Sequence, residues 1–262
     1  SWSSAKSVTN ALVGIMVKDG KLRVDQPAPM PAWQSPDDPR RHITIENLLH
    51  MSSGLQSEGS ATGHAYWGGI DTAKAIATTQ PEAEPGTRWK YSNYDTLLLI
   101  RSIKEVIGKE KDYWLLPRKR LLNKIGMRHT FPEIDPFGNY ILSSQMYTTP
   151  RDLARFGMLY LHDGVWNGER ILPEGWVAYT QEPAPAKVNA DERDWGYGKQ
   201  FWLLGRDPRV PGDTYTTAGA RGQLSTIVPS RNLVVVRTGL DPRGEDNWDQ
   251  VEFVADVLKA IP

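Results

Sequence analysis

The period of the hydrophobic pattern changes near residue 195, and this change constrains the fold more than any other feature of the chain. Before residue 195, apolar residues recur at helical spacing; after it, short β-branched and aromatic runs alternate with turn residues. These runs are GYGKQFWLL (196–204), QLSTIVPS (223–230) and NLVVVRTGL (232–240). A last helical pattern covers residues 248–260. The order predicts an α+β fold, in which the first and last helices flank an antiparallel sheet beside a mostly helical subdomain.

Capping residues predict where the helices begin. The first helix is expected over residues 4–18. Thr44 and Thr149 each precede an apolar-periodic segment and are expected to be N-caps, because a hydroxyl can accept from a free backbone N–H of the first turn. For the long helix in the middle of the chain, Asn93 or Asp95 is expected to take this role.

The length of 262 residues suits one large domain. We expect a single domain over 1–262, with residues 1–25 and 195–262 on the sheet side and residues 26–194 in the mostly helical part. Basic and acidic side chains both number 31, so the net charge is zero and no nucleic-acid partner is indicated. No apolar run approaches the roughly 18 residues of a membrane span.

The composition also limits the chemistry. The chain has no cysteine, which excludes disulfides and thiolate metal sites. Its histidines lack metal-ligand spacing, and no glycine-rich phosphate loop follows a predicted strand. We therefore expect neither a metal nor a cofactor.

A serine and a lysine stand three residues apart at the start of the first helix, as Ser3-x-x-Lys6. On a helix these two side chains share one face, where an amine could take the proton of a nucleophilic hydroxyl. The same spacing arises when a capping serine precedes a solvated lysine. Taken alone, the motif favours this second interpretation.

Two further segments carry candidate site residues. Tyr91-x-Asn93 stands in a turn before the long helix, where a side chain can point into a cleft; a turn tyrosine followed by a capping asparagine is the alternative. Gly219 and Gly222 stand at the entrance to a strand, where backbone N–H groups can approach a ligand; a bulge or hairpin turn is the alternative.

Together and in this order, the three motifs resemble those of the penicillin-recognising serine hydrolases, which include class C β-lactamases, DD-peptidases and related esterases. ITIENLLHMSSGL and EPGTRWKYSN resemble segments of the same family, and SSQMYTTPRDLARFGMLYLHDGVWNGERILPEGW resembles its 6-aminohexanoate-dimer hydrolases and carboxylesterases. The similarity covers essentially the whole chain. It implies a β-lactamase/transpeptidase-like fold with the glycine-containing triplet on an edge strand. It also implies hydrolysis of ester or non-peptide amide bonds in small molecules through an acyl-enzyme.

The resemblance assigns roles to individual residues. Ser3 would be the nucleophile, and Lys6 and Tyr91 would act as a coupled pair that accepts its proton. Asn93 would orient the lysine or the substrate carbonyl. The backbone N–H groups of Ser3 and Ala220 would form the oxyanion hole.

Substrate contacts are expected from aromatic residues and from the glycine segment. The residues expected to bind substrate are Tyr66, Trp67, Tyr147, Trp202, Gly219 and Arg221. For the four aromatic rings, a role in the core or at the surface is an equal alternative.

The glycine triplet departs from the pattern of lactamases and peptidases. Their triplet begins with lysine or histidine, whereas here the matching residues are Thr217, Ala218 and Gly219. The cation that would hold a β-lactam carboxylate is therefore missing, which favours ester or non-peptide amide substrates over lactams and peptides. Our hypothesis is that Arg221 supplies a replacement cation.

The start of the chain also departs from the family pattern, because relatives carry strands ahead of the serine motif. The resemblance implies that these N-terminal strands are missing here. We expect a sheet of about three strands whose exposed edge favours association, with a missing N-terminal segment or with a second copy. These departures leave a non-catalytic binding protein with a degenerate site as the alternative from another class.

Overall fold

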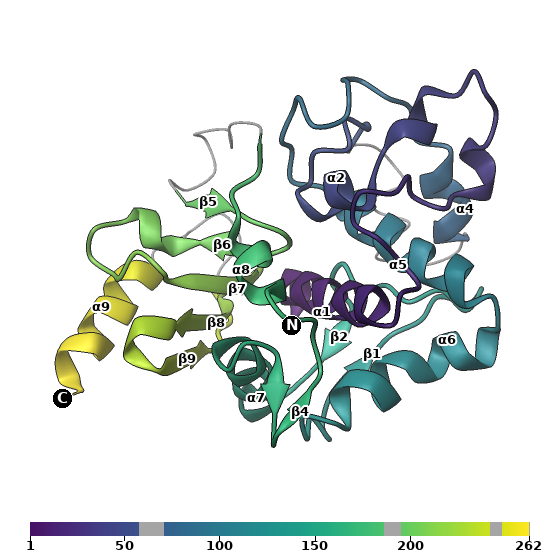
Figure 1. Ribbon diagram of the computed structural model, residues 1–262. Helices are drawn as coiled ribbons and strands as arrows, with labels where there is room; N and C mark the ends of the chain where they lie inside the picture. The colour runs from purple at the N-terminus through teal and green to yellow at the C-terminus, as the bar shows by residue number, and fades with distance from the viewer. Residues whose placement is uncertain (58–70, 186–194, 242–247, 262) are drawn as a thin grey trace.

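The structure, a computed structural model, describes residues 1–57, 71–185, 195–241 and 248–261. One long helix, α1 (Ala5–Lys18), runs through the middle of the molecule, between the sheet and a group of helices (Figure 1). It follows directly on a 3-10 turn, η1 (Trp2–Ser4), so the helix predicted over residues 4–18 is confirmed. Every residue of α1 from Ala5 to Met16 is buried.

Buried polar side chains near the start of α1 donate to main-chain carbonyls of the surrounding segments. The bonds are Ser4 Oγ to Gln223 O (2.8 Å), Ser7 Oγ to Gln200 O (2.7 Å), Thr9 Oγ1 to Leu142 O (3.0 Å) and Asn10 Nδ2 to Lys199 O (2.9 Å). A buried polar group without a partner costs about 1–3 kcal/mol. These bonds therefore fix the rotation of α1 about its own axis.

The main sheet is antiparallel throughout, with strand order β5–β6–β7–β8–β9. Its strands are β5 (Gly196–Tyr197), β6 (Trp202–Leu203), β7 (Tyr215–Gly219), β8 (Gln223–Val228) and β9 (Leu233–Arg237). The antiparallel arrangement confirms the prediction, but the expected number of strands is wrong. Residues 196–204 form two short strands around a turn, and the segment expected to lead into a strand is itself β7.

The glycine triplet lies on an interior strand of the described sheet and not on an edge strand, contrary to the expectation. However, β6 pairs only with Tyr215 and Thr216 of β7. Thr217, Ala218 and Gly219 pair on the β8 side alone. Among the described residues, this half of β7 is therefore a local edge, and it contacts η1.

Helices cover both faces of the sheet (Figure 1). Successive residues of a strand point to opposite faces. Val234 lies against Gly157 of α7 (Pro150–Leu161), whereas Val235 packs in an apolar cluster with α9 (Gln250–Ala260). α7 and α9 therefore lie on opposite faces. α1 contacts β7, so the first and last helices both flank the sheet as predicted.

The helical part is organised around α5 (Asn93–Ile107), which contacts α1, α2, α4 and α6. These neighbours are α2 (Ile45–Leu49), α4 (Thr72–Ala77) and α6 (Glu110–Leu116), which continues into a π-helical turn, η4 (Pro117–Leu122). Thr44 and Thr149 cap α2 and α7 as predicted. The predicted cap of α5 is wrong: Ser92 accepts from two N–H groups of its first turn, and Asn93 is the first helical residue.

Shorter elements connect these layers. They are η2 (Pro31–Trp33), η3 (Pro39–His42), β1 (Phe131–Pro132), β2 (Met146–Tyr147), β3 (Val165–Trp166), β4 (Glu169–Arg170), α8 (Trp176–Gln181), η5 (Leu204–Arg206) and η6 (Pro229–Arg231). Among the described residues, none of the helices has the length and apolar character needed to cross a membrane. α7 packs on the sheet although its residues belong to the range 26–194 expected to form the helical part. The division of the chain into a sheet side and a helical part stays a prediction.

Candidate active site

The two residues of the first motif are in hydrogen-bond contact. Ser3 lies half-buried in η1, one turn before Lys6, and Lys6 Nζ donates to Ser3 Oγ at 3.3 Å. The Lys6 side chain is only 2% exposed, so this lysine is not the solvated residue of the alternative interpretation. The fold therefore places an amine beside a hydroxyl that solvent can still approach.

Lys6 has two further acceptors, both without charge. Nζ donates to Asn93 Oδ1 at 2.5 Å and to the main-chain carbonyl of Ser143 at 2.7 Å. Asn93 is presented by the first turn of α5 because Ser92 takes the capping position. Ser143 had no signal in the sequence, since any residue can supply a carbonyl there.

Burial lowers the pKa of Lys6 from its ordinary value to about 7, because the ammonium form loses its hydration. A neutral amine has two N–H groups and one lone pair. The Asn93 and Ser143 oxygens can accept both N–H groups, which leaves the lone pair for the Ser3 hydroxyl. This arrangement suits a general base at neutral pH.

Tyr91 forms the next side of the site. Lys6 Nζ lies 5.0 Å from the centroid of the Tyr91 ring. That ring stacks on Trp202 at 5.6 Å between centroids and 22° between planes, and it meets Tyr197 edge-on at 6.1 Å. Trp89 lies against both Tyr197 and Trp202. Tyr91, Trp202, Tyr197 and Trp89 are called the aromatic wall below.

The end of β7 packs against the candidate nucleophile's own turn. A Cβ on Gly219 would lie 2.0 Å from the main-chain oxygen of Ser1, so only glycine allows this approach. Ser4, directly after Ser3, donates to the Gln223 carbonyl at the start of β8. The exposed Ala220 follows Gly219 in the turn between β7 and β8, which places its backbone at the same edge of the sheet as Ser3.

Thr217 and Arg221 contribute differently from a lysine of the family triplet. Thr217 is buried, and its hydroxyl donates a hydrogen bond to Ser4 Oγ at 3.3 Å, which links β7 to η1. Arg221 is half-buried in the β7–β8 turn with a left-handed φ of 62°, and its Nε donates to the Asp241 carbonyl at 3.0 Å. The structure thus places Arg221 beyond the glycine and ties it to the segment after β9.

The remaining predicted contacts divide into two groups. Tyr66 and Trp67 lie outside the described residues. Tyr147 is 60% exposed in β2, opposite Phe131, and does not join the aromatic wall. Sequence reasoning missed Trp89 and Tyr197 as parts of the wall, although the abundance of tryptophan and tyrosine was a signal for them.

Strained backbone gathers around this site. Asp163, Asn167 and Asn232 have positive φ in turns, where Asp and Asn are common. The other non-glycine residues of positive φ in the described chain are Trp2, Met51, Gln200 and Arg221. Each of these four adjoins the site or contacts an element that carries it, which is where backbone strain is often retained for function.

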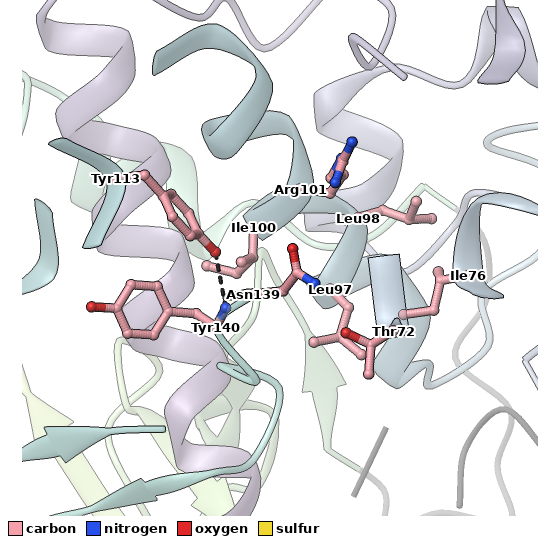
Figure 2. A pocket seen from close by; sticks show the side chains of 9 residues that line it. All are labelled: Thr72, Ile76, Leu97, Leu98, Ile100, Arg101, Tyr113, Asn139 and Tyr140. Atoms are coloured by element: carbon pink, nitrogen blue, oxygen red, sulfur yellow. Dashed lines mark hydrogen bonds between the residues drawn. The ribbon is translucent and has the colours of Figure 1, made fainter. Parts of the chain in front are cut away.

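One enclosed space in the helical part is too small for a substrate. It lies among α4, α5 and α6, and Tyr113 and Tyr140 on its wall are joined by a bond from the Tyr140 N–H to the Tyr113 Oη at 2.9 Å (Figure 2). Its volume is about 10 Å³, room for one water at most. Its lining contains none of the candidate site residues.

Comparison with known proteins identifies the family. A family model described as Beta-lactamase matches residues 1–251. The 6-aminohexanoate-dimer hydrolase of Paenarthrobacter ureafaciens is 23% identical over 285 residues, which cover 99% of this chain and 71% of that protein.

Solved structures agree on the fold. A Bacillus anthracis protein assigned as a 6-aminohexanoate-dimer hydrolase has a TM-score of 0.80 at 20% identity, over 100% of this chain and 73% of its own. A family VIII carboxylesterase has a TM-score of 0.75 at 13% identity, over 97% of this chain and 80% of its own. The expected β-lactamase/transpeptidase-like fold is confirmed. With its family model matched over nearly the whole length, this chain belongs to the β-lactamase family of serine hydrolases.

Proposed function

We propose that the protein cleaves ester or non-peptide amide bonds of small molecules, with Ser3 as nucleophile and an acyl-enzyme as intermediate. The observation that carries this proposal is the Lys6 amine, which is buried among uncharged acceptors and lies 3.3 Å from Ser3 Oγ. Because burial lowers the pKa of Lys6 to about 7, a large fraction of this amine is free to accept a proton at neutral pH.

In the first half-reaction, Ser3 Oγ attacks the carbonyl carbon while its proton passes to Lys6. The N–H groups of Ser3 and Ala220 hold the oxyanion, and each such donor is worth about 3–4 kcal/mol in the transition state. The tetrahedral intermediate then expels the alcohol or amine, which takes the proton back from the Lys6–Tyr91 pair. Water repeats these steps on the acyl-enzyme and releases the acid. The proton belongs to the Lys6–Tyr91 pair as a unit.

The surroundings support a mainly apolar acyl group. The aromatic wall begins beside Lys6, and flat or aliphatic groups can lie against its half-buried Tyr91 and Trp202 rings. Thr217 offers no cation for a carboxylate, which disfavours lactams and peptides. If Arg221 supplies this cation instead, Arg221→Ala will change the selectivity between anionic and neutral acyl substrates; unchanged selectivity would refute that role.

A burst assay with a p-nitrophenyl ester tests the proposal. We expect stoichiometric p-nitrophenol release, absent in Ser3→Ala, while circular dichroism shows that the variant is folded. Ser102→Ala is the matched control, because Ser102 is buried in α5 and its hydroxyl donates to the Leu98 carbonyl of the same helix at 2.8 Å. If the wild-type chain releases no p-nitrophenol, a non-catalytic binding protein would be favoured. Faster turnover of a chromogenic cephalosporin than of the ester would favour a lactamase.

A further inference from the structure

The turn between β5 and β6 is buried, which is unusual for a loop. All its residues from Gly198 to Phe201 are buried, and a Cβ on Gly198 would lie 2.4 Å from the Thr180 carbonyl. A buried turn needs a partner for each polar group. Here Lys199 N donates to the Thr180 carbonyl at 2.9 Å, and Asn10 Nδ2 donates to the Lys199 carbonyl at 2.9 Å.

Gln200 is the residue of this turn with strained backbone. Its φ is 65°, a left-handed value that is strained for a residue other than glycine, and its side chain is 2% exposed. Glycine or asparagine would adopt this backbone more easily. The bonds that its side chain makes can offset this strain.

The side chain of Gln200 has a partner for each of its polar atoms. Nε2 donates to the carbonyls of Leu48 at 3.2 Å and Leu49 at 2.9 Å, at the end of α2. Oε1 accepts from Thr96 Oγ1 of α5 at 2.7 Å. The main-chain oxygen accepts from Ser7 Oγ of α1 at 2.7 Å. One residue thus bonds to α1, α2 and α5.

Two of these bonds connect the same two helices as the Lys6–Asn93 contact at the centre of the site. Ser7 directly follows Lys6 on α1, and Thr96 lies one turn after Asn93 on α5. The path Ser7–Gln200–Thr96 therefore spans the same two helices as the direct bond from Lys6 Nζ to Asn93 Oδ1. From this geometry we infer that Gln200 is a positioning residue, which holds α1 and α5 at the spacing that the Lys6–Asn93 contact needs. The inference deepens the proposed function and rests on it for its kinetic consequence.

If the spacing relaxes, Lys6 loses an acceptor and gains water, so the base becomes misplaced and more easily protonated. The titratable group in contact with Lys6 among the described residues is Tyr91, and burial is the cause of the lowered pKa. A misplacement on the order of 1 Å can cost about 100-fold in rate. We expect kcat to fall by about 10- to 100-fold, with KM changed much less.

The variants are Thr96→Val and Gln200→Gly. Thr96→Val removes one hydroxyl at nearly constant volume and leaves the residues of the strained turn unchanged. Gln200→Gly relieves the φ strain and removes the side chain, but it keeps the carbonyl that Ser7 uses. Gln250→Ala is the matched control, because Gln250 is equally buried and also bonds to a threonine, Thr226 Oγ1 at 2.9 Å, on the far side of the sheet.

Two readouts separate this inference from the proposed function. The first is the pH profile of ester hydrolysis, whose midpoint we expect near pH 7 in the wild type and higher in both variants. The second is the NMR titration of the Lys6 side chain, which needs no turnover. We expect the same upward shift there, and non-additive effects in the double variant.

The possible outcomes are distinct. Wild-type kcat and an unshifted Lys6 titration in folded Thr96→Val would overturn the inference, as would equal rate losses in Thr96→Val and Gln250→Ala. If the wild type has no burst, the proposed function fails, and the Lys6 titration alone decides the positioning role. If Gln200→Gly does not fold, Thr96→Val still decides it.

Discussion

Among the residues that the structure describes, two lysines are buried, and their surroundings differ in one respect. Lys6 is 2% exposed and donates to a hydroxyl, an amide oxygen and a peptide carbonyl, all of them uncharged. Lys199 has no exposed side-chain surface but donates to Glu182 at 2.8 Å and lies 3.7 Å from Glu46. Within the described part of the chain, Lys199 therefore has carboxylate partners, and Lys6 has none.

The pKa values follow this difference. Burial lowers the pKa of Lys6 to about 7, with no carboxylate to oppose it. Burial also lowers the pKa of Lys199, but Glu182 and Glu46 oppose part of this shift. Through its contacts with Glu46 and Glu182, Lys199 links α2 to the end of α8. Burial among uncharged acceptors thus favours the neutral amine, whereas neighbouring carboxylates favour the ammonium form.

The largest expected effect is that of Lys6→Met. Removing the general base should lower kcat by about 10²- to 10⁴-fold, because the Lys6–Tyr91 pair loses the amine that contacts Ser3 Oγ. Single-turnover kinetics with a p-nitrophenyl ester measure this loss. If Lys6→Met still acylates at the wild-type rate, Tyr91 would be the base. Lys6 would then differ from Lys199 in its surroundings but not in its role.

The same variant should change how stability depends on pH. An unfolded lysine has a pKa of about 10.4, so between pH 7 and 10 the unfolded chain binds a proton that native Lys6 does not. The free energy of unfolding should then rise with pH, by up to about 1.4 kcal/mol per unit from this group. Urea unfolding of wild type and Lys6→Met at several pH values measures the difference, and parallel curves would contradict it.

Asn93→Asp should make Lys6 resemble Lys199. A carboxylate at the position of Asn93 Oδ1, 2.5 Å from Nζ, favours the ammonium form and raises the pKa of Lys6. The rate at pH 7 should fall by about 10- to 100-fold and recover at higher pH, as the midpoint of the profile moves upward. Asn123→Asp, at an exposed position, is the control. An unmoved midpoint would show that Lys6 does not set the profile.

Lys199→Met should give the smallest effect, confined to stability. It removes the partner of Glu182 and Glu46, but their side chains are 61% and 40% exposed and can be hydrated. We expect a loss of about 1–2 kcal/mol in unfolding free energy, with kcat within about twofold of wild type. A rate loss as large as that of Lys6→Met would show that the second lysine also serves the chemistry.

Side-chain motifs made part of this structure predictable. Ser3, Lys6 and Asn93 meet as expected, because each belongs to a motif at the start of a predicted helix. The capping threonines were predictable for the same reason. At α5, adjacent serine and asparagine are both good caps, and only the fold decides between them.

Features that depend on the main chain or on tertiary contacts could not be predicted. The carbonyl of Ser143 carries no side-chain signal. The left-handed position of this turn, residue 200, carries glutamine in place of the glycine or asparagine that usually marks such a residue, so the sequence favours one continuous strand. Its conformation is fixed by bonds to helices far away along the chain, which local pattern does not encode.

The polar residues at the start of α1 have a consequence for how such proteins diverge. Their acceptors at positions 142, 199, 200 and 223 are peptide oxygens. Peptide oxygens survive almost any substitution, so the loops around the helix can exchange their side chains without releasing it. A fold held by such bonds can keep the position of α1 while the side chains around it change. This agrees with the TM-score of 0.80 between this chain and a structure that is only 20% identical to it.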